Sequence, residues 1–389
     1  MPRQRDYTGP AIFSYGFRPF FFFGSIYAAV AVMVWLPVFH GHFELVTAFA
    51  PRDWHVHEML FGYAAAVVTG FLLTAIPNWT GRLPLQGKPL FILFGTWVAG
   101  RVAILASAEI GWVAAMAIDA AFLILVAAAA AREIIAGRKW NNLKVVVIVS
   151  LLALTNIAFH LEAHFSGLAE YSSRGGIAFV IALIMVIGGR IVPSFTRNWL
   201  ARRSPGPMPV PFNRFDAVVV TISVAALVIW IAAPMGKLIA LAMIVAGGLQ
   251  VVRLARWAGY RTAPDRLVLI LHVAYAFVPV GFLLSGLGAL DVILPSAGIH
   301  AWTGGAIGTM TLAVMSRASL GHTGRVLAAS VPTQFIYGAI VVAAVARICA
   351  AILPDQMMTF LPIAGFAWVI AFTGFALVYA KVLCTPQRA

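Results

Sequence analysis

The feature that most constrains this chain is a series of twelve long, continuous apolar stretches. A transmembrane helix needs about 20 predominantly apolar residues, and lipid offers the backbone no hydrogen-bond partner, so such stretches must be helical. A closed β-barrel would show short alternating segments instead. The sequence therefore predicts an all-α, polytopic membrane protein with about twelve transmembrane helices. The predicted spans are 20–38, 55–77, 88–107, 111–135, 143–164, 174–196, 213–232, 236–257, 264–288, 297–319, 331–353 and 358–382.

The composition excludes the main classes of water-soluble protein. Of the 389 residues, 62% are hydrophobic and only 10% are charged, whereas a soluble domain is about half apolar and a quarter charged. The formal net charge of +14 would suggest nucleic acid in a soluble domain. In a membrane protein it indicates basic cytoplasmic loops instead. The expected partner is the lipid bilayer, and no nucleic acid is expected.

The basic residues predict the orientation in the membrane. Twenty-one of the 27 Lys and Arg residues lie at the two termini or in every second loop, and the opposite loops hold only Arg52, Arg174 and Lys237. The positive-inside rule then places both termini in the cytoplasm. We expect residues 1–389 to form a single integral membrane domain. It would have two six-helix halves, joined by a Pro-rich linker at about 197–212.

Seven of the nine histidines fall at the predicted outer face. Ionisable residues within a membrane are costly, and each is a functional candidate. His57, His160 and His300 lie on three helices at a similar depth, roughly 9–14 Å outward of the middle at 1.5 Å per residue. Asn156, His160 and His164 recur every four residues and share one helix face. The candidate metal ligands are therefore His57, His160, His164 and His300.

Other spacings suggest a haem. His300, Gly304 and Gly308 also recur every four residues, and a histidine above a strip of glycines suits a planar macrocycle held by an axial imidazole. Glycines at this spacing more often form a helix-packing surface than a cofactor groove. His55 and His57 are two residues apart, so on a regular helix only one of them can face a given site.

Five further residues are candidates because they are ionisable and lie within predicted spans. Arg101 either forms an ion pair with Asp119 that joins two helices, or binds a haem propionate. Glu58 is a candidate for proton delivery, which makes it the proposed catalytic residue, or for metal ligation. Arg190 needs a buried partner, either a carboxylate or a propionate. His272 is either a ligand at a second site or a polar packing residue.

The two cysteines, Cys349 and Cys384, form no disulfide framework and no CxxC metal site. The chain also contains no Cys-x-x-Cys-His sequence. Any haem would therefore be bound non-covalently, as haem b.

Several long motifs are spread over nearly the whole chain. They are Phe17–Phe21, Trp54–Tyr63, Gly70–Ala75, Pro77–Gly81, Gly188–Arg190 and Thr309–Arg325. In these motifs the chain resembles the NnrS family of bacterial inner-membrane proteins. The resemblance implies a twelve-helix protein of the bacterial cytoplasmic membrane that contains haem and copper and is linked to denitrification and to resistance against nitric oxide. It does not imply which histidine binds which metal.

The leading hypothesis is a haem- and copper-containing membrane protein acting in nitric oxide metabolism or resistance to nitrosative stress. Nitric oxide would be bound or reduced at a periplasm-side metal site, and reduction would need an electron donor that the sequence does not identify. One alternative is a non-catalytic electron-transfer or metal-handling protein. Another is a twelve-helix transporter, which would have a mid-membrane site and broken helices. A terminal oxidase is not expected, because the chain lacks His-Pro-Glu-Val-Tyr and vicinal histidines.

Overall fold

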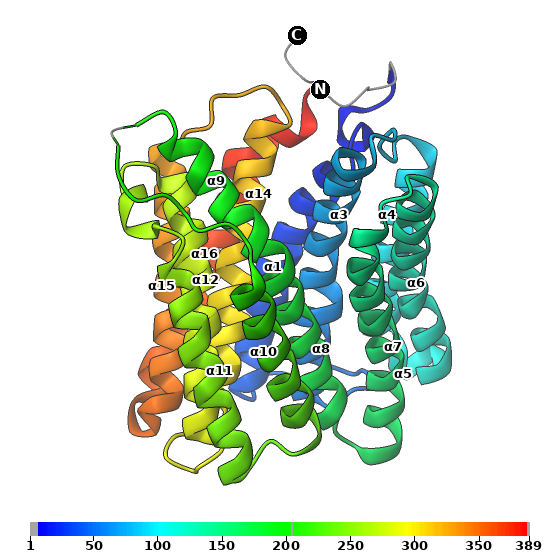
Figure 1. The fold of residues 1–389 in the computed structure, drawn as a ribbon. Coiled ribbons are helices and arrows are strands. Elements are labelled where there is room, and N and C mark those ends of the chain that lie inside the picture. The colour runs from blue at the N-terminus through cyan, green and yellow to red at the C-terminus, as the bar shows by residue number, and fades with distance from the viewer. Residues whose placement is uncertain (1–6, 204, 387–389) are drawn as a thin grey trace. The chain divides into compact units, whose positions relative to one another are not determined.

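The computed structural model describes residues 7–203 and 205–386. Helices form all the regular structure of these residues, and no strand occurs among them (Figure 1). The α-helices are α1 (Phe17–Phe39), α2 (Pro51–His57), α3 (Ala65–Thr80), α4 (Lys88–Leu105), α5 (Ser107–Ile110), α6 (Trp112–Ala136), α7 (Leu143–Ser166), α8 (Glu170–Leu183), α9 (Gly189–Leu200), α10 (Arg214–Ala232), α11 (Lys237–Ala255), α12 (Arg266–Gly288), α13 (Ser296–His300), α14 (Thr309–Gly321), α15 (Val331–Ile352) and α16 (Met357–Cys384).

Three of the long helices change to a π-helix part of the way along. The π-helical segments are η2 (Glu58–Ala64), η4 (Ile184–Gly188) and η6 (Ala301–Gly308). They connect α2 to α3, α8 to α9 and α13 to α14 respectively. Such segments are rare and occur frequently at functional sites. The first of them begins at Glu58, directly after His57.

Four short 3₁₀-helices complete the regular structure. They are η1 (Ala11–Phe13), η3 (Trp140–Asn142), η5 (Gly259–Thr262) and η7 (Pro354–Gln356).

Local sequence signals explain where several helices begin and end. Gly81 and Gly167 follow α3 and α7 with φ of +74° and +79°, a left-handed conformation that glycine adopts without steric cost. Asn213 and Asp216 form a capping box at the start of α10, which satisfies backbone N–H groups that have no partner within the helix. Pro51 is the first residue of α2, where a missing N–H costs nothing.

Eleven helices among the described residues are long and apolar enough to cross a membrane. Each of them coincides with one of the predicted spans, with ends that differ by a few residues. The remaining prediction, the tenth span at 297–319, is not among the eleven. The chain is helical there from Ser296 to Gly321, but this helix is rich in glycine and threonine and is less apolar than the others.

The two ends of the membrane domain meet within one compact unit. The buried Arg18 of α1 donates from Nη1 to the carbonyl oxygens of Leu383, at 2.9 Å, and Thr385, at 2.7 Å. The start of α1 and the end of α16 therefore lie on the same side of the membrane. A chain that starts and ends on one side crosses the membrane an even number of times. We therefore count the Ser296–Gly321 helix as the twelfth crossing. That the shared side is the cytoplasm stays a prediction.

The chain divides into two compact units. Unit 1 contains residues 1–179, 318–326 and 372–389, and unit 2 contains residues 180–317 and 327–371. Within unit 1, α4 packs against α6 and α6 packs against α7 (Figure 1). The prediction of two six-helix halves around a 197–212 linker stays a prediction.

The Pro-rich linker lies within unit 2 and is held in place by hydrogen bonds to its backbone. The N–H of Val210 donates to the carbonyl oxygen of Arg256 at 3.0 Å. The Arg261 side chain donates to the carbonyl oxygen of Pro207 at 2.7 Å, and the Arg197 side chain donates to that of Pro209 at 2.5 Å.

Candidate metal centre

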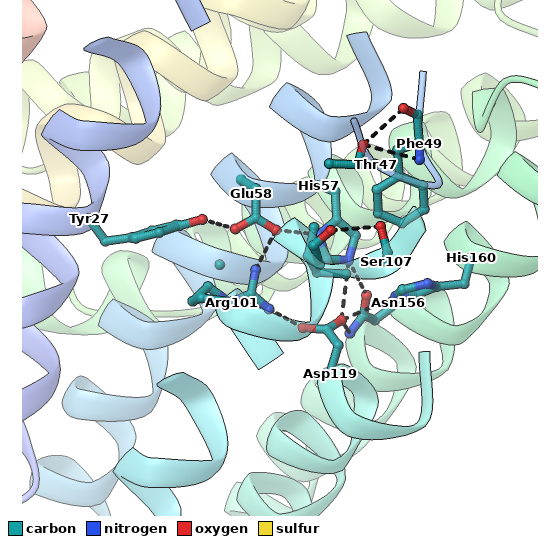
Figure 2. Close-up of polar contacts among 12 residues, drawn as sticks. Tyr27, Thr47, Phe49, His57, Glu58, Arg101, Ser107, Asp119, Asn156 and His160 are labelled. Atoms are coloured by element: carbon teal, nitrogen blue, oxygen red, sulfur yellow. Dashed lines mark hydrogen bonds and ion pairs between the residues drawn. The ribbon is translucent and has the colours of Figure 1, made fainter. Parts of the chain in front are cut away.

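Six buried polar side chains meet inside unit 1 (Figure 2). Each of the six residues, taken as a whole, has a relative exposure of 5% or less. The π-helical segment η2 and the helices α2, α4, α6 and α7 supply them. They are His57, Glu58, Arg101, Asp119, Asn156 and His160. Charged groups within a membrane pair with one another or line a functional site. The charged members of this cluster pair with one another.

Arg101 lies between two carboxylates. Its Nη1 donates to Oε1 of Glu58 at 2.6 Å, and its Nη2 forms an ion pair with Asp119. Of the two alternatives for Arg101, the structure shows the ion pair with Asp119, which joins α4 and α6. The backbones of α4 and α6 approach closely here, since a Cβ on Gly100 would lie 3.2 Å from the Cα of Asp119. Both outer nitrogens of Arg101 are engaged by this chain's own carboxylates, so the arrangement does not favour a role in binding a haem propionate.

Both ring nitrogens of His57 face oxygen atoms. Nδ1 is 2.8 Å from Oε1 of Glu58, and Nε2 is 2.9 Å from Oδ1 of Asn156 and 3.2 Å from Oδ2 of Asp119. The amide of Asn156 is oriented by its own bond, because Nδ2 donates to Oδ2 of Asp119 at 2.7 Å. A neutral imidazole has only one N–H. The second nitrogen therefore needs either an added proton or a cation between it and these oxygens.

His57, Asp119 and His160 have the geometry of a metal site. Their ligand atoms all lie within 4.8 Å of one another. Oδ2 of Asp119 is 3.2 Å from Nε2 of His57 and 3.3 Å from Nε2 of His160. Two ligands of a tetrahedral ion with bonds of about 2.0–2.1 Å lie about 3.3 Å apart, so a small cation fits these residues.

Local structure and packing bring these residues together. His160 follows Asn156 by four residues on α7, so the two share a face, as the spacing predicts. On the other side, the change from α2 to η2 lets the adjacent His57 and Glu58 both contribute to the cluster. The ring of Phe49 lies 5.0 Å from the rings of both His57 and His160. This apolar cover excludes water from the imidazoles.

Tyr27 of α1 extends the cluster toward the outside of the unit. Its half-buried hydroxyl donates to Oε2 of Glu58. Gly62 makes room for this contact, because a Cβ there would lie 2.8 Å from Nη1 of Arg101 and 3.0 Å from the Tyr27 ring. The arrangement gives His57 a carboxylate partner on Nδ1, and such a partner orients metal-binding histidines and fixes their tautomer.

Two other predicted histidines of unit 1 lie outside this cluster. His55 stacks on Trp35 with ring centroids 4.5 Å apart. His164 is exposed and stacks on Trp112 at 4.2 Å. The structure thus brings His57 and His160 together with Asp119, and it does not bring His55 or His164 to them. The helix α2 begins at Pro51, four residues before the predicted span. His57 therefore lies in the second turn of the helix and not at its start.

His272 belongs to unit 2 and binds a hydroxyl. Its Nε2 is 2.8 Å from Oγ1 of Thr196, and that hydroxyl donates its single hydrogen to the carbonyl oxygen of Val192 at 2.9 Å. Nε2 of His272 must therefore be the donor, and Nδ1 carries a lone pair. This buried Nδ1 has no hydrogen-bond partner among the described residues. Gly259 lies against it, because a Cβ there would be only 2.5 Å away.

His300 is half-buried in unit 2, and Oγ1 of Thr303 lies 3.4 Å from its Nδ1. The glycine strip below it is partly filled. A Cβ on Gly308 would lie 2.6 Å from the Trp368 ring, whereas Gly304 has only the Cα of Ala344 nearby, at 3.9 Å. The contact at Gly308 is a helix-packing contact, so this part of the strip leaves no room for a macrocycle.

Arg190 does not line a buried site. Its side chain is exposed and lies over the ring of Phe212, with Cζ 6.0 Å from the ring centroid. The buried arginine of unit 2 is instead Arg253, which the sequence pattern places in a cytoplasmic loop. It lies in α11 and donates to Oδ1 of Asp216 at 3.0 Å and to the Tyr275 hydroxyl at 2.6 Å. Sequence reasoning missed this pair because it lies near the helix ends, among exposed basic residues.

The chain matches the family model described as NnrS protein over residues 11–387. No curated protein matches it. The match spans nearly the whole chain and includes every residue of the cluster. The chain therefore belongs to the NnrS family, and this membership supports a role in the nitric oxide response in general.

Proposed function

We propose that this protein is a copper-binding membrane protein of the nitric oxide response and that His57, Asp119 and His160 hold the ion. The observation that carries the proposal is the convergence of their three ligand atoms within 4.8 Å in a fully buried setting. Imidazole nitrogen suits copper as well as zinc, iron and nickel, and copper is the metal that the family resemblance implies.

The cluster is buried beneath the apolar Phe49 ring, so it offers nitric oxide a site shielded from water. Copper bound there would supply a redox-active Lewis acid able to bind the molecule. Nitric oxide is small and uncharged, so it can reach the centre through lipid and needs no polar channel. We propose that the protein lies in the bacterial cytoplasmic membrane. An electron donor is required only if nitric oxide is reduced and not merely bound.

Glu58 is the proposed proton-carrying residue. Its Oε1 accepts from His57 and Arg101, and its Oε2 accepts from Tyr27. Reduction of nitric oxide consumes protons, and Glu58 is the carboxylate that contacts both the metal-facing histidine and the half-buried Tyr27. The carboxylate of Glu58 thus links His57 to the Tyr27 hydroxyl, between the cluster and the outside of the unit.

Haem b is the second cofactor that the resemblance implies. The residues around His57 do not fit it, because aromatic rings surround the imidazole and occupy the space that a macrocycle needs. His272 and His300 are the proposed ligands in unit 2. A haem at either position requires a packing contact, at Gly259 or at Gly308, to open. A pyridine haemochrome assay on His272→Ala and His300→Ala tests this assignment.

A second candidate is a cluster without metal that only joins helices. It is favoured by the ion pairs of Arg101 with Glu58 and Asp119, which already offset one of the two negative charges. In this case an added proton on His57 would satisfy the second ring nitrogen.

Metal analysis of the purified protein separates the two candidates. We expect about one copper per chain in the wild type and a loss of at least about tenfold in His57→Ala, His160→Ala and Asp119→Asn. His164→Ala is the matched control, because His164 lies one turn from His160 on α7 but is exposed and stacked on Trp112. Equal copper content in all folded variants would contradict the proposal and leave the cluster a structural one.

A further inference from the structure

A second feature of unit 1 is an open groove between α4 and α6, on the outside of the helices. Its volume is about 470 Å³, which is within the range of small-molecule sites. Apolar side chains such as Leu85, Ile92 and Leu125 form most of its wall, and Lys88 and Arg132 are its basic members. The groove is separate from the metal centre and is not explained by it.

The two basic residues lie at one end of the groove, and apolar residues continue it deeper into the membrane. Lys88 is the first residue of α4, and Arg132 lies in the last turns of α6, so both belong to the end that the positive-inside rule places in the cytoplasm. Ile92 follows Lys88 by four residues and Leu125 precedes Arg132 by seven, which puts them about 6–10 Å deeper in the membrane. A cationic end above an apolar wall matches the order of headgroup and acyl chain in a phospholipid.

The cationic end has an excess of positive charge. No carboxylate among the described residues forms an ion pair with Lys88. Arg132 binds Glu133 at 2.9 Å, and the same carboxylate also binds Arg82 at 2.6 Å. Arg82 and Arg132 thus share one carboxylate and Lys88 has none, and exposed ion pairs of this kind contribute little to stability. The groove end therefore attracts an anion.

We propose that this groove binds an anionic phospholipid of the cytoplasmic leaflet. The phosphate lies between Lys88 and Arg132, and an acyl chain runs along Ile92 and Leu125. These two apolar residues are 53% and 43% exposed, on a surface that faces lipid in the membrane. Basic pockets between helices on the cytoplasmic side are typical sites for acidic lipids.

Native mass spectrometry of the full chain in detergent tests the proposal with phosphatidylglycerol as the probe and phosphatidylcholine as the zwitterionic comparison. The double variant Lys88→Gln/Arg132→Gln is compared with Arg138→Gln/Lys139→Gln, which makes the same change in charge at exposed residues outside the groove. We expect the wild type and the control to retain one phosphatidylglycerol. The groove variant should bind it roughly 30-fold more weakly, the product expected for two basic residues at a lipid surface.

Several outcomes would overturn the proposal. Equal losses in both double variants would mean that only the general surface charge attracts lipid. Unchanged binding in the groove variant would place the lipid elsewhere. Equal retention of phosphatidylcholine, displacement of the lipid by inorganic phosphate alone, or a dimer that excludes lipid from α4 and α6 would each assign the groove to another occupant. Unaltered copper content in the groove variant shows that it is folded.

Discussion

The buried Arg101 provides the sharpest test of how the cluster is held together. Its Nη1 is 2.6 Å from Oε1 of Glu58. At that distance an effective dielectric constant of about 20 gives a gross attraction of ~6 kcal/mol, most of which the loss of hydration offsets. Removing one partner of a buried pair leaves an uncompensated charge and costs about 3–5 kcal/mol. We therefore expect Arg101→Met to lower the free energy of unfolding by about 3–5 kcal/mol.

Arg82 is the matched control for burial. It binds Glu133 at the same 2.6 Å, but its side chain is 45% exposed whereas that of Arg101 is 6% exposed. Exposed ion pairs contribute about 0–1 kcal/mol, so Arg82→Met should lower the free energy of unfolding by less than about 1 kcal/mol.

The assay is equilibrium unfolding in mixed micelles by increasing amounts of a denaturing detergent, followed by tryptophan fluorescence. Trp97 reports on the region directly, because its Nε1 donates to the carbonyl oxygen of Gly62 at 2.9 Å. If Arg101→Met does not fold, Arg101→Lys keeps the charge but loses the forked geometry and should give an intermediate loss. Equal losses for Arg101→Met and Arg82→Met would refute the reasoning, because they would show that burial does not set the energy of these pairs.

Three further predictions follow from single contacts. Gly62→Ala should destabilise the protein by about 1–3 kcal/mol, because its Cβ would lie 2.8 Å from Nη1 of Arg101, whereas Gly95→Ala, with no neighbouring atom within 4 Å, should be neutral or slightly stabilising in the same unfolding assay. Glu58→Gln should keep the copper content, because Glu58 is not a proposed ligand, and should slow any nitric oxide consumption, measured with an electrode. Tyr15→Phe should raise the free energy of unfolding by ~1 kcal/mol, because the buried Tyr15 hydroxyl has no hydrogen-bond partner among the described residues. Burial also raises the pKa of Tyr15 to about 12 from 10.0, so the wild type should lose stability relative to this variant as the pH rises from 10 toward 12.

The sequence predicted most of the fold because long apolar runs determine helices directly in a membrane. The Ser296–Gly321 helix shows where this signal weakens, since its glycines and threonines reduce hydropathy even though the helix is continuous. The π-helical segments were not predictable from these runs. The hydropathy of an apolar stretch is the same whether the stretch forms an α-helix or a π-helix.

Part of the candidate site was also predictable. Helical periodicity placed Asn156 and His160 on one face, and the cost of intramembrane charge singled out Arg101 and Asp119. The pattern could not choose between His55 and His57, because that choice depends on where the helix begins.

Tyr27 gave no signal, since one tyrosine in an apolar span is common and its contact with Glu58 joins residues 31 positions apart. Arg253 also gave no signal, because the sequence pattern groups it with the basic residues of a predicted cytoplasmic loop. Such contacts depend on tertiary packing and not on local sequence.

The measurement that tests the central claim most directly is pulsed electron paramagnetic resonance of Cu(II) in the purified protein, because it counts the imidazole nitrogens bound to the ion. We predict couplings from two imidazoles in the wild type and in His164→Ala, and from one in His57→Ala or His160→Ala at copper concentrations high enough to fill the weakened site. A wild-type spectrum without imidazole coupling, or the same two couplings in His57→Ala and His160→Ala, would contradict the assignment of copper to His57, Asp119 and His160.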